Sequence, residues 1–187
     1  RESILEKVRL ATILGTFQST LVNFKYVSKS WKKNCEEERL LGVSLTGIMD
    51  CEVTNGKGPA GSLPAVLIDF KNMAIRTNKE FAEKLGINQS VAVTCVKPSG
   101  TVSQLTNAAS GIHARHNPYY VRTVRADNKD PLCKMMKKEG FPNEPDVSKP
   151  DHTTVFSFPA KSPKGAICRN DMTAWKQLSL WHTYAKE

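Results

Sequence analysis

The sequence lacks the features that would identify a membrane-spanning, secreted or common nucleotide-binding protein. No uncharged run approaches the roughly 20 apolar residues of a membrane helix, and the N-terminus has no basic-then-apolar signal peptide. The cysteines form no C-x-x-C pair, which excludes a zinc ribbon and a thioredoxin-like motif. G-x-x-x-x-G-K-S/T does not occur, and the turn at residues 97–104 contains no G-x-G-x-x-G, so neither of the two commonest phosphate loops describes that turn. We expect a cytoplasmic protein, because the five cysteines are odd in number and widely spaced, as free thiols of a reducing compartment are.

Composition indicates a globular chain with a basic surface. The 187 residues are 40% hydrophobic and 24% charged, which suits one domain or a large piece of a bigger one. Lys and Arg outnumber Asp and Glu by 27 to 18, giving a net charge of +9. This excess is compatible with an anionic partner, but no block carries five or six like charges in a row. A solvated surface explains the charge equally well. A basic nucleic-acid-binding domain is kept as an alternative, although nucleic acid is the less favoured partner.

Hydrophobic periodicity and turn residues predict helices that alternate with strands. Strands are expected at residues 40–46, 90–96, 119–125 and 153–158. Helices are expected at residues 3–24, 28–39, 64–85, 102–109 and 130–140, with a last helix capped by Asn170 or Asp171. Residues 54–62 form a glycine-rich loop, and Thr77 to Glu80 could start a second helix within 64–85. This alternation predicts the α/β class, with 1–187 as a single segment.

The turn after the strand at residues 90–96 is the strongest candidate for chemistry. It reads K-P-S-G-T-V-S-Q and leads into a helical stretch. A helix N-terminus offers unpaired N–H groups, glycine permits a close backbone approach, and hydroxyls add donors. The predicted phosphate-binding residues are Pro98, Ser99, Gly100, Thr101, Val102 and Ser103. The alternative is an ordinary Ser/Thr-capped helix that follows a buried strand.

A second polar cluster, S-G-I-H-A-R-H-N, spans residues 110–117. Arg115 between two imidazoles suits an anion, or simply a polar loop. His113 and His116 lie three apart, but no nearby carboxylate or cysteine completes a metal site, so no metal is predicted. Tyr119 and Tyr120 near two arginines suit either a base-stacking surface or a solvated strand.

Four stretches resemble the adenosylcobalamin-dependent (class II) ribonucleotide reductases, most of all the monomeric ribonucleoside-triphosphate reductase type. They are V-A-V-T-C-V-K-P-S-G-T-V-S-Q-L (91–105), S-G-I-H-A-R-H-N-P-Y-Y-V-R-T-V-R (110–125), R-L-L-G-V-S-L-T-G-I-M-D (39–50) and the final helix, A-W-K-Q-L-S-L-W-H-T-Y-A-K-E. They follow one another in the family's order and cover nearly all of the chain.

The resemblance implies an enzyme that reduces ribonucleoside triphosphates to deoxyribonucleotides by thiyl radical chemistry. The implied fold is part of the second half of a ten-stranded α/β barrel. The implied cofactor is adenosylcobalamin, and the implied partners are the nucleotide substrate and a thioredoxin-type reductant. The turn from Pro98 to Ser103 would hold the substrate phosphates, and Gly111, Ile112, His113 and Arg115 are candidates to line the active site. A reductase of the same superfamily with another radical generator, such as an oxygen-dependent metal subunit, is the alternative.

The resemblance also predicts what this segment does not carry. The radical cysteine, with its flanking Asn and Glu, should precede Arg1, and the electron-exchanging cysteines should follow Glu187. The effector site should also lie outside. No catalytic residue is therefore assigned, and none of the five cysteines matches a family position: Cys35, Cys51, Cys95, Cys133 and Cys168. Because the first residue is not Met, we expect an internal segment that is inactive alone.

Overall fold

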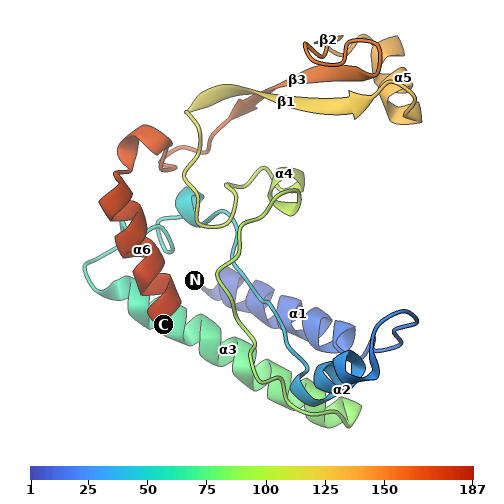
Figure 1. The fold of residues 1–187 in the computed structure, drawn as a ribbon. Coiled ribbons are helices and arrows are strands. Elements are labelled where there is room, and N and C mark those ends of the chain that lie inside the picture. Colours follow the sequence, from blue (N-terminus) through green and yellow to red (C-terminus); the bar gives the residue numbers. More distant parts are fainter.

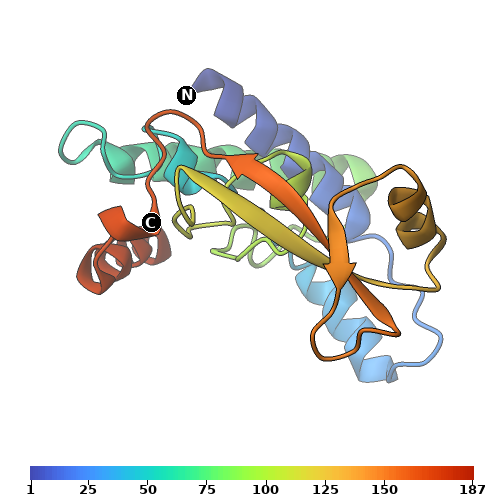
Figure 2. The same ribbon diagram turned by 90° about the horizontal axis from the view of Figure 1, so that it is seen from above.

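The computed structural model describes all residues, 1–187, and has the open C shape seen in Figure 1. One arm holds a small sheet with helix α5, the other holds helices α1, α2 and α3, and α4 projects between them (Figures 1 and 2). The helices are α1 (Glu2–Gln18), α2 (Lys29–Glu38), α3 (Ser62–Leu85), α4 (Val102–Leu105), α5 (Pro131–Lys138) and α6 (Ala174–Lys186), with short 3-10 turns η1 (Ile48–Asp50) and η2 (Arg169–Asp171). The strands are β1 (Tyr119–Asp127), β2 (Asn143–Pro145) and β3 (Thr153–Lys161). No helix is both long and apolar enough to cross a membrane.

Helix α3 is a single helix of 24 residues, which decides between the two predicted alternatives. It runs without a break from Ser62 to Leu85. Thr77 is buried inside it, so it does not cap a second helix. Gly86 ends α3 in the left-handed conformation, with φ +64°, as predicted. The sequence thus located the C-terminus of this helix from one local residue.

Helix α1 packs along α3, and a buried polar group joins them. The Asn78 amide donates to the Thr16 and Ser90 hydroxyls at 3.0 and 2.9 Å, and its Oδ1 accepts the Ser90 N–H at 2.9 Å. Asn78 is fully buried, so these bonds satisfy groups that would otherwise be costly to bury. Helix α1 ends at Gln18 rather than residue 24. The Ser19 and Thr20 hydroxyls donate to the carbonyls three residues before them and compete with further helical bonds.

The strands predicted at 40–46 and 90–96 lie side by side in parallel, but they form only an isolated bridge. Val43 faces Thr94. Val43 N–H donates to Val93 O at 3.0 Å, and Cys95 N–H donates to Val43 O at 3.1 Å. Neither segment has a second neighbouring strand within the chain, and parallel pairs are rarely extended without one. The prediction of two full strands was therefore wrong for this chain, while their adjacency is real.

The sheet is antiparallel, with the order β1-β3-β2. Its register runs from Tyr119 opposite Lys161 to Asp127 opposite Thr153. Phe156, at its centre, is only 1% exposed. Both long strands were predicted, whereas the three-residue strand β2 was not, because it lies in a loop rich in Pro and Asn. Helix α5 begins as predicted, with the Asp130 side chain accepting the Leu132 N–H.

Two further predicted helix boundaries were wrong. Helix α4 ends at Leu105 rather than at residue 109, because Asn107 adopts a left-handed conformation with φ +47° and turns the chain back. Helix α6 is capped by the Thr173 hydroxyl, which accepts the Lys176 N–H, rather than by Asn170 or Asp171. Those two residues belong to η2, where the Asp171 carboxylate accepts the Cys168 N–H.

The main core lies where α1, α3 and α6 meet the parallel pair. Its 13 buried residues come from α1, η1, α3 and α6 and from the segments that connect the elements. They are Val8, Ile48, Met49, Leu63, Val66, Leu67, Phe70, Ala74, Val93, Ala109, Ile112, Ile167 and Leu180. The chain is a mixture of helices and strands, in agreement with the predicted α/β class. Burial of the 109–112 loop fixes the position of the turn that precedes it.

Candidate functional site

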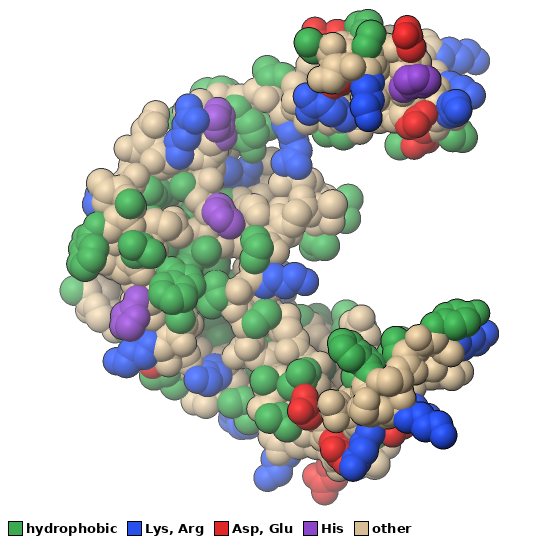
Figure 3. Space-filling model, in the orientation of Figure 1, with side chains coloured by type: hydrophobic (Ala, Val, Ile, Leu, Met, Phe, Trp, Pro, Cys, Tyr) green, Lys and Arg blue, Asp and Glu red, His purple; other side chains and the backbone are tan.

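The predicted phosphate turn lies at the carboxyl end of the 90–97 segment and enters the mouth between the two arms (Figure 1). The space-filling view shows this mouth open to solvent, with Lys and Arg side chains along its inner edge (Figure 3). Pro98, Gly100, Thr101 and Val102 are exposed, and Ser103 is fully buried. The turn therefore presents its tip to solvent and anchors its base in the protein.

Three serines hold the turn in shape. The Ser99 hydroxyl accepts the Ser103 N–H at 2.9 Å, and the Ser103 hydroxyl donates to the Ser99 carbonyl at 3.2 Å. The Ser110 hydroxyl donates to the same carbonyl at 2.5 Å and accepts the Ser99 N–H at 3.2 Å. Ser103 thus faces inward, so the structure gives its hydroxyl a part in shaping the turn.

The tip of the turn carries donors that nothing in the chain uses. The N–H groups of Gly100, Thr101 and Val102 have no acceptor, and neither has the Thr101 hydroxyl. A Cβ added to Gly100 would meet no atom within 4 Å, so packing inside the chain does not require glycine there. Several adjacent N–H groups facing open space form the kind of concavity that receives an anion.

The second predicted cluster packs directly beneath the turn. A Cβ on Gly111 would lie 2.6 Å from the Lys97 carbonyl oxygen, and Gly111 has φ +50°, so no other residue fits without moving the turn. Ile112 is buried, and its carbonyl accepts from the Gln177 amide at 3.2 Å. His113 is exposed, with Nδ1 3.1 Å from the Ser110 carbonyl. Of this predicted set, His113 has the freest side chain.

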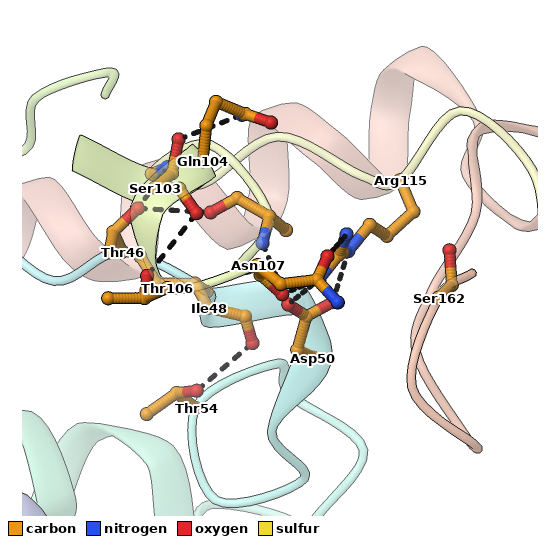
Figure 4. Close-up of polar contacts among 12 residues, drawn as sticks. Thr46, Ile48, Asp50, Thr54, Ser103, Gln104, Thr106, Asn107, Arg115 and Ser162 are labelled. Carbon is orange, nitrogen blue, oxygen red and sulfur yellow. Dashed lines mark hydrogen bonds and ion pairs between the residues drawn. The ribbon is translucent and has the colours of Figure 1, made fainter. Parts of the chain in front are cut away.

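Arg115 is enclosed by acceptors instead of lining an open cavity (Figure 4). Its Nε and Nη2 donate to the two carboxylate oxygens of Asp50 at 2.9 and 2.8 Å. Other guanidinium bonds reach the Asn107 side chain and carbonyl and the Tyr120 hydroxyl. Its side chain is only 3% exposed, and the hydrogen bonds to Asp50 raise the pKa of the guanidinium. Arg115 is therefore a fixed cation that holds the loop.

Sequence reasoning missed Asp50 and Thr46, which complete this network. The Asp50 carboxylate also accepts the Ala109 N–H at 2.7 Å. The Thr46 hydroxyl accepts the Gly111 N–H and donates to the Ala109 carbonyl, both at 3.0 Å. These partners lie about 65 residues from the loop, so no local spacing could reveal them. The one available signal was the lone acid at the end of T-G-I-M-D.

Nothing in the chain gathers as a metal or thiol centre. No three His, Cys, Asp or Glu side chains come close enough to hold a metal ion. His116 packs edge-on against Tyr120, with ring centroids 6.1 Å apart. Cys168 is buried beside the Arg115 backbone, and burial raises the pKa of its thiol, which makes it a poor nucleophile.

The sequence of this chain is similar to those of several known reductases. The adenosylcobalamin-dependent ribonucleoside-triphosphate reductase of Euglena gracilis is 30% identical over 199 residues, covering 96% of this chain and 27% of that protein. A probable reductase of the same kind from Dictyostelium discoideum is 31% identical, covering 96% of this chain and 26% of that protein. The chain is homologous to the adenosylcobalamin-dependent ribonucleotide reductases. It spans about a quarter of the length of these relatives.

A solved structure agrees with the fold of this chain. A crystal structure of a B12-dependent (class II) ribonucleotide reductase superposes with a TM-score of 0.73, covering 95% of this chain and 29% of that one. The sequences are 20% identical, so this comparison supports the fold alone. No protein-family model matches the chain.

Proposed function

We propose that this chain is the part of an adenosylcobalamin-dependent ribonucleoside-triphosphate reductase that holds the substrate phosphates. The observation that carries the proposal is the turn tip, where three adjacent N–H groups and the Thr101 hydroxyl face solvent without a partner. Adjacent N–H groups and a hydroxyl are the kinds of donor that bind phosphate oxygens. Lys97, which is exposed and forms no ion pair, adds a positive charge at the start of the turn.

The proposed division of labour separates binding from support. The N–H groups of Gly100, Thr101 and Val102 bind phosphate oxygens, and the Thr101 hydroxyl donates one further bond. Ser99, Ser103 and Ser110 keep the turn in the conformation that aims these groups outward. Gly111, Ile112 and Arg115 form the layer beneath, and His113 faces the surroundings of the substrate. Preformed donors lose little entropy on binding, which favours affinity.

The proposed setting of the turn is the second half of a ten-stranded α/β barrel. The parallel pair at Val43 and Thr94 would be two of its strands, extended by neighbours from the rest of the enzyme. The phosphate turn then follows the carboxyl end of a parallel strand, which is where α/β folds bind their ligands.

The whole enzyme would replace the ribose 2′-hydroxyl of the substrate with hydrogen and take its electrons from a thioredoxin-type reductant. The relatives' names favour adenosylcobalamin over an oxygen-dependent metal subunit, and this cofactor supplies the radical that starts the reaction. The three best-defined cavities have volumes of about 590 to 670 Å³, in the range of small-molecule sites, and none of their residues is assigned to the cofactor.

Kinetics of the full-length enzyme test the phosphate role. Replacing Ser99 and Thr101 by alanine removes one support and one direct donor, while Thr123→Ala, at an exposed strand position, serves as the matched control. A hydrogen bond to a charged group contributes about 1.5–3 kcal/mol, so we expect the KM for ribonucleoside triphosphates to rise roughly 10- to 100-fold with little change in kcat. An unchanged KM in the double variant would show that the turn does not hold the phosphates.

A further inference from the structure

The glycine-rich loop at residues 54–62, which the phosphate turn leaves unexplained, borders a second cavity. This cavity has a volume of about 670 Å³ and lies between the loop, the start of α3 and helix α6. In Figure 1 the loop that precedes α3 runs close to α6, away from α4. None of residues 98–103 lines it. The two features are therefore separate places in the molecule.

The loop and the helix start leave several backbone donors unused. Helix α3 begins after Gly61, which has φ +77° and provides no side-chain cap. The N–H groups of Gly58, Ala60, Gly61 and Leu63 have no acceptor within the chain. A Cβ on Gly61 would meet nothing within 4 Å, so the space above the helix is open. The N-terminus of so long a helix carries a partial positive charge that favours an anion.

An independent observation comes from a buried side chain beside these donors. Asn55 is only 5% exposed and lines the cavity. Its Oδ1 accepts the Lys57 N–H at 2.9 Å, which fixes the orientation of the amide. Its Nδ2 is buried and has no hydrogen-bond partner. A buried amide that lacks an acceptor costs about 1–3 kcal/mol, so an acceptor supplied by a ligand would relieve the deficit.

Charged side chains at the cavity complete the arrangement. Lys57 and Lys176 line it, and neither forms an ion pair. Glu52 and Asp171 also line it, but one Asp171 oxygen already accepts the Cys168 N–H. The formal charges of the two lysines and the two carboxylates cancel. The unused N–H groups therefore make the cavity more favourable for an anion than for a cation.

We infer that this cavity binds a phosphate group, with Asn55 Nδ2, the loop N–H groups and two lysines as its donors. The ligand is inorganic phosphate or the phosphate end of a nucleotide. Trp175, exposed at the cavity, offers a stacking face if the source is a nucleotide. This inference does not depend on the role of the turn at residues 98–103.

Lysine acylation of the full-length protein tests the site locally. The labelling rates of Lys57 and Lys176 are measured by peptide mass spectrometry with and without pyrophosphate or ATP. Lys129, exposed and without an ion pair, is the internal control. We expect both probes to slow labelling at Lys57 and Lys176 at least fivefold and to leave Lys129 unchanged. Equal protection by the two probes identifies the ligand as a simple phosphate. Stronger protection by ATP than by pyrophosphate identifies it as a nucleotide.

Two variants test the roles of Asn55 and Lys176 as donors to the bound phosphate. Asn55→Asp retains the acceptor for the Lys57 N–H, replaces the unpartnered donor with a carboxylate, and should weaken protection at least tenfold. Lys176→Gln changes an exposed side chain outside the packing and should weaken it severalfold. Labelling of Lys57 that neither probe slows, or protection that survives in both variants, would overturn the assignment. If protection is absent while the Ser99 and Thr101 variants of the same protein still raise the KM for ribonucleoside triphosphates, only the second site is excluded and the phosphate turn is not.

Discussion

Replacing Arg115 by alanine removes the central cation of the loop network. The change deletes five donated hydrogen bonds and leaves the Asp50 carboxylate, whose side chain is 13% exposed, without its partner. Breaking a buried ion pair from one side costs about 3–5 kcal/mol. For a chain of this size each kcal/mol shifts Tm by about 2–4 °C, so we expect Tm to fall by about 6–20 °C.

A double-mutant cycle separates the ion pair from the packing of its side chains. Arg115→Met keeps much of the side-chain volume, and Asp50→Asn keeps an acceptor for the Ala109 N–H. The double variant buries no unpaired charge, so we expect it to be about 2–3 kcal/mol more stable than the sum of the single effects implies. Urea unfolding provides the free energies, and the exposed pair Glu80 and Lys84 provides a control cycle with an expected coupling of only about 0.3–0.5 kcal/mol. Single effects that add within about 0.5 kcal/mol would refute the reasoning.

Three smaller predictions follow from other contacts. Asn78→Leu strands the buried Ser90 N–H and should lower the unfolding free energy by about 2–4 kcal/mol in urea; a neutral result would mean that the junction repacks. Gly111→Ala places a methyl against the Lys97 carbonyl at a positive φ and should lower Tm by several degrees, and an unchanged Tm in calorimetry would contradict this close approach. A hydrogen bond from Arg125 lowers the pKa of Asp146, so the pair stabilises the fold above a pH of about 4 and loses this effect as pH falls through the lowered pKa. Arg125→Gln should therefore raise the Asp146 midpoint in an NMR titration, and an unmoved midpoint would exclude the cause.

Local signals in the sequence located most helix ends. Gly86 stops α3, and Asp130 with the following proline starts α5, because each acts on its own turn. Competing local signals explain the misses. Asn170 and Asp171 are good caps in isolation, but they form a 3-10 turn, and Thr173 three residues on caps α6. Asn107 shortens α4, which residue preference alone did not indicate.

Non-local contacts account for what the sequence did not reveal. The strands at 40–46 and 90–96 were predicted from their apolar residues, yet neither has a second neighbouring strand in the fold, and they form only an isolated bridge. The residue types of Pro98 to Ser103 located the turn from the sequence alone. Which of its N–H groups stay exposed and unpaired depends on the contacts made by the folded chain. The support given by Asp50 to Arg115 joins positions 65 apart, which only the folded chain brings together.

The most direct test of the phosphate proposal is a structure of the full-length enzyme with a ribonucleoside triphosphate bound. The account predicts phosphate oxygens about 2.7–3.2 Å from the backbone nitrogens of Gly100, Thr101 and Val102, the usual range for such bonds. It also predicts that Ser99 and Ser110 keep their mutual bonds. A triphosphate bound elsewhere, with these three N–H groups facing only water, would contradict it.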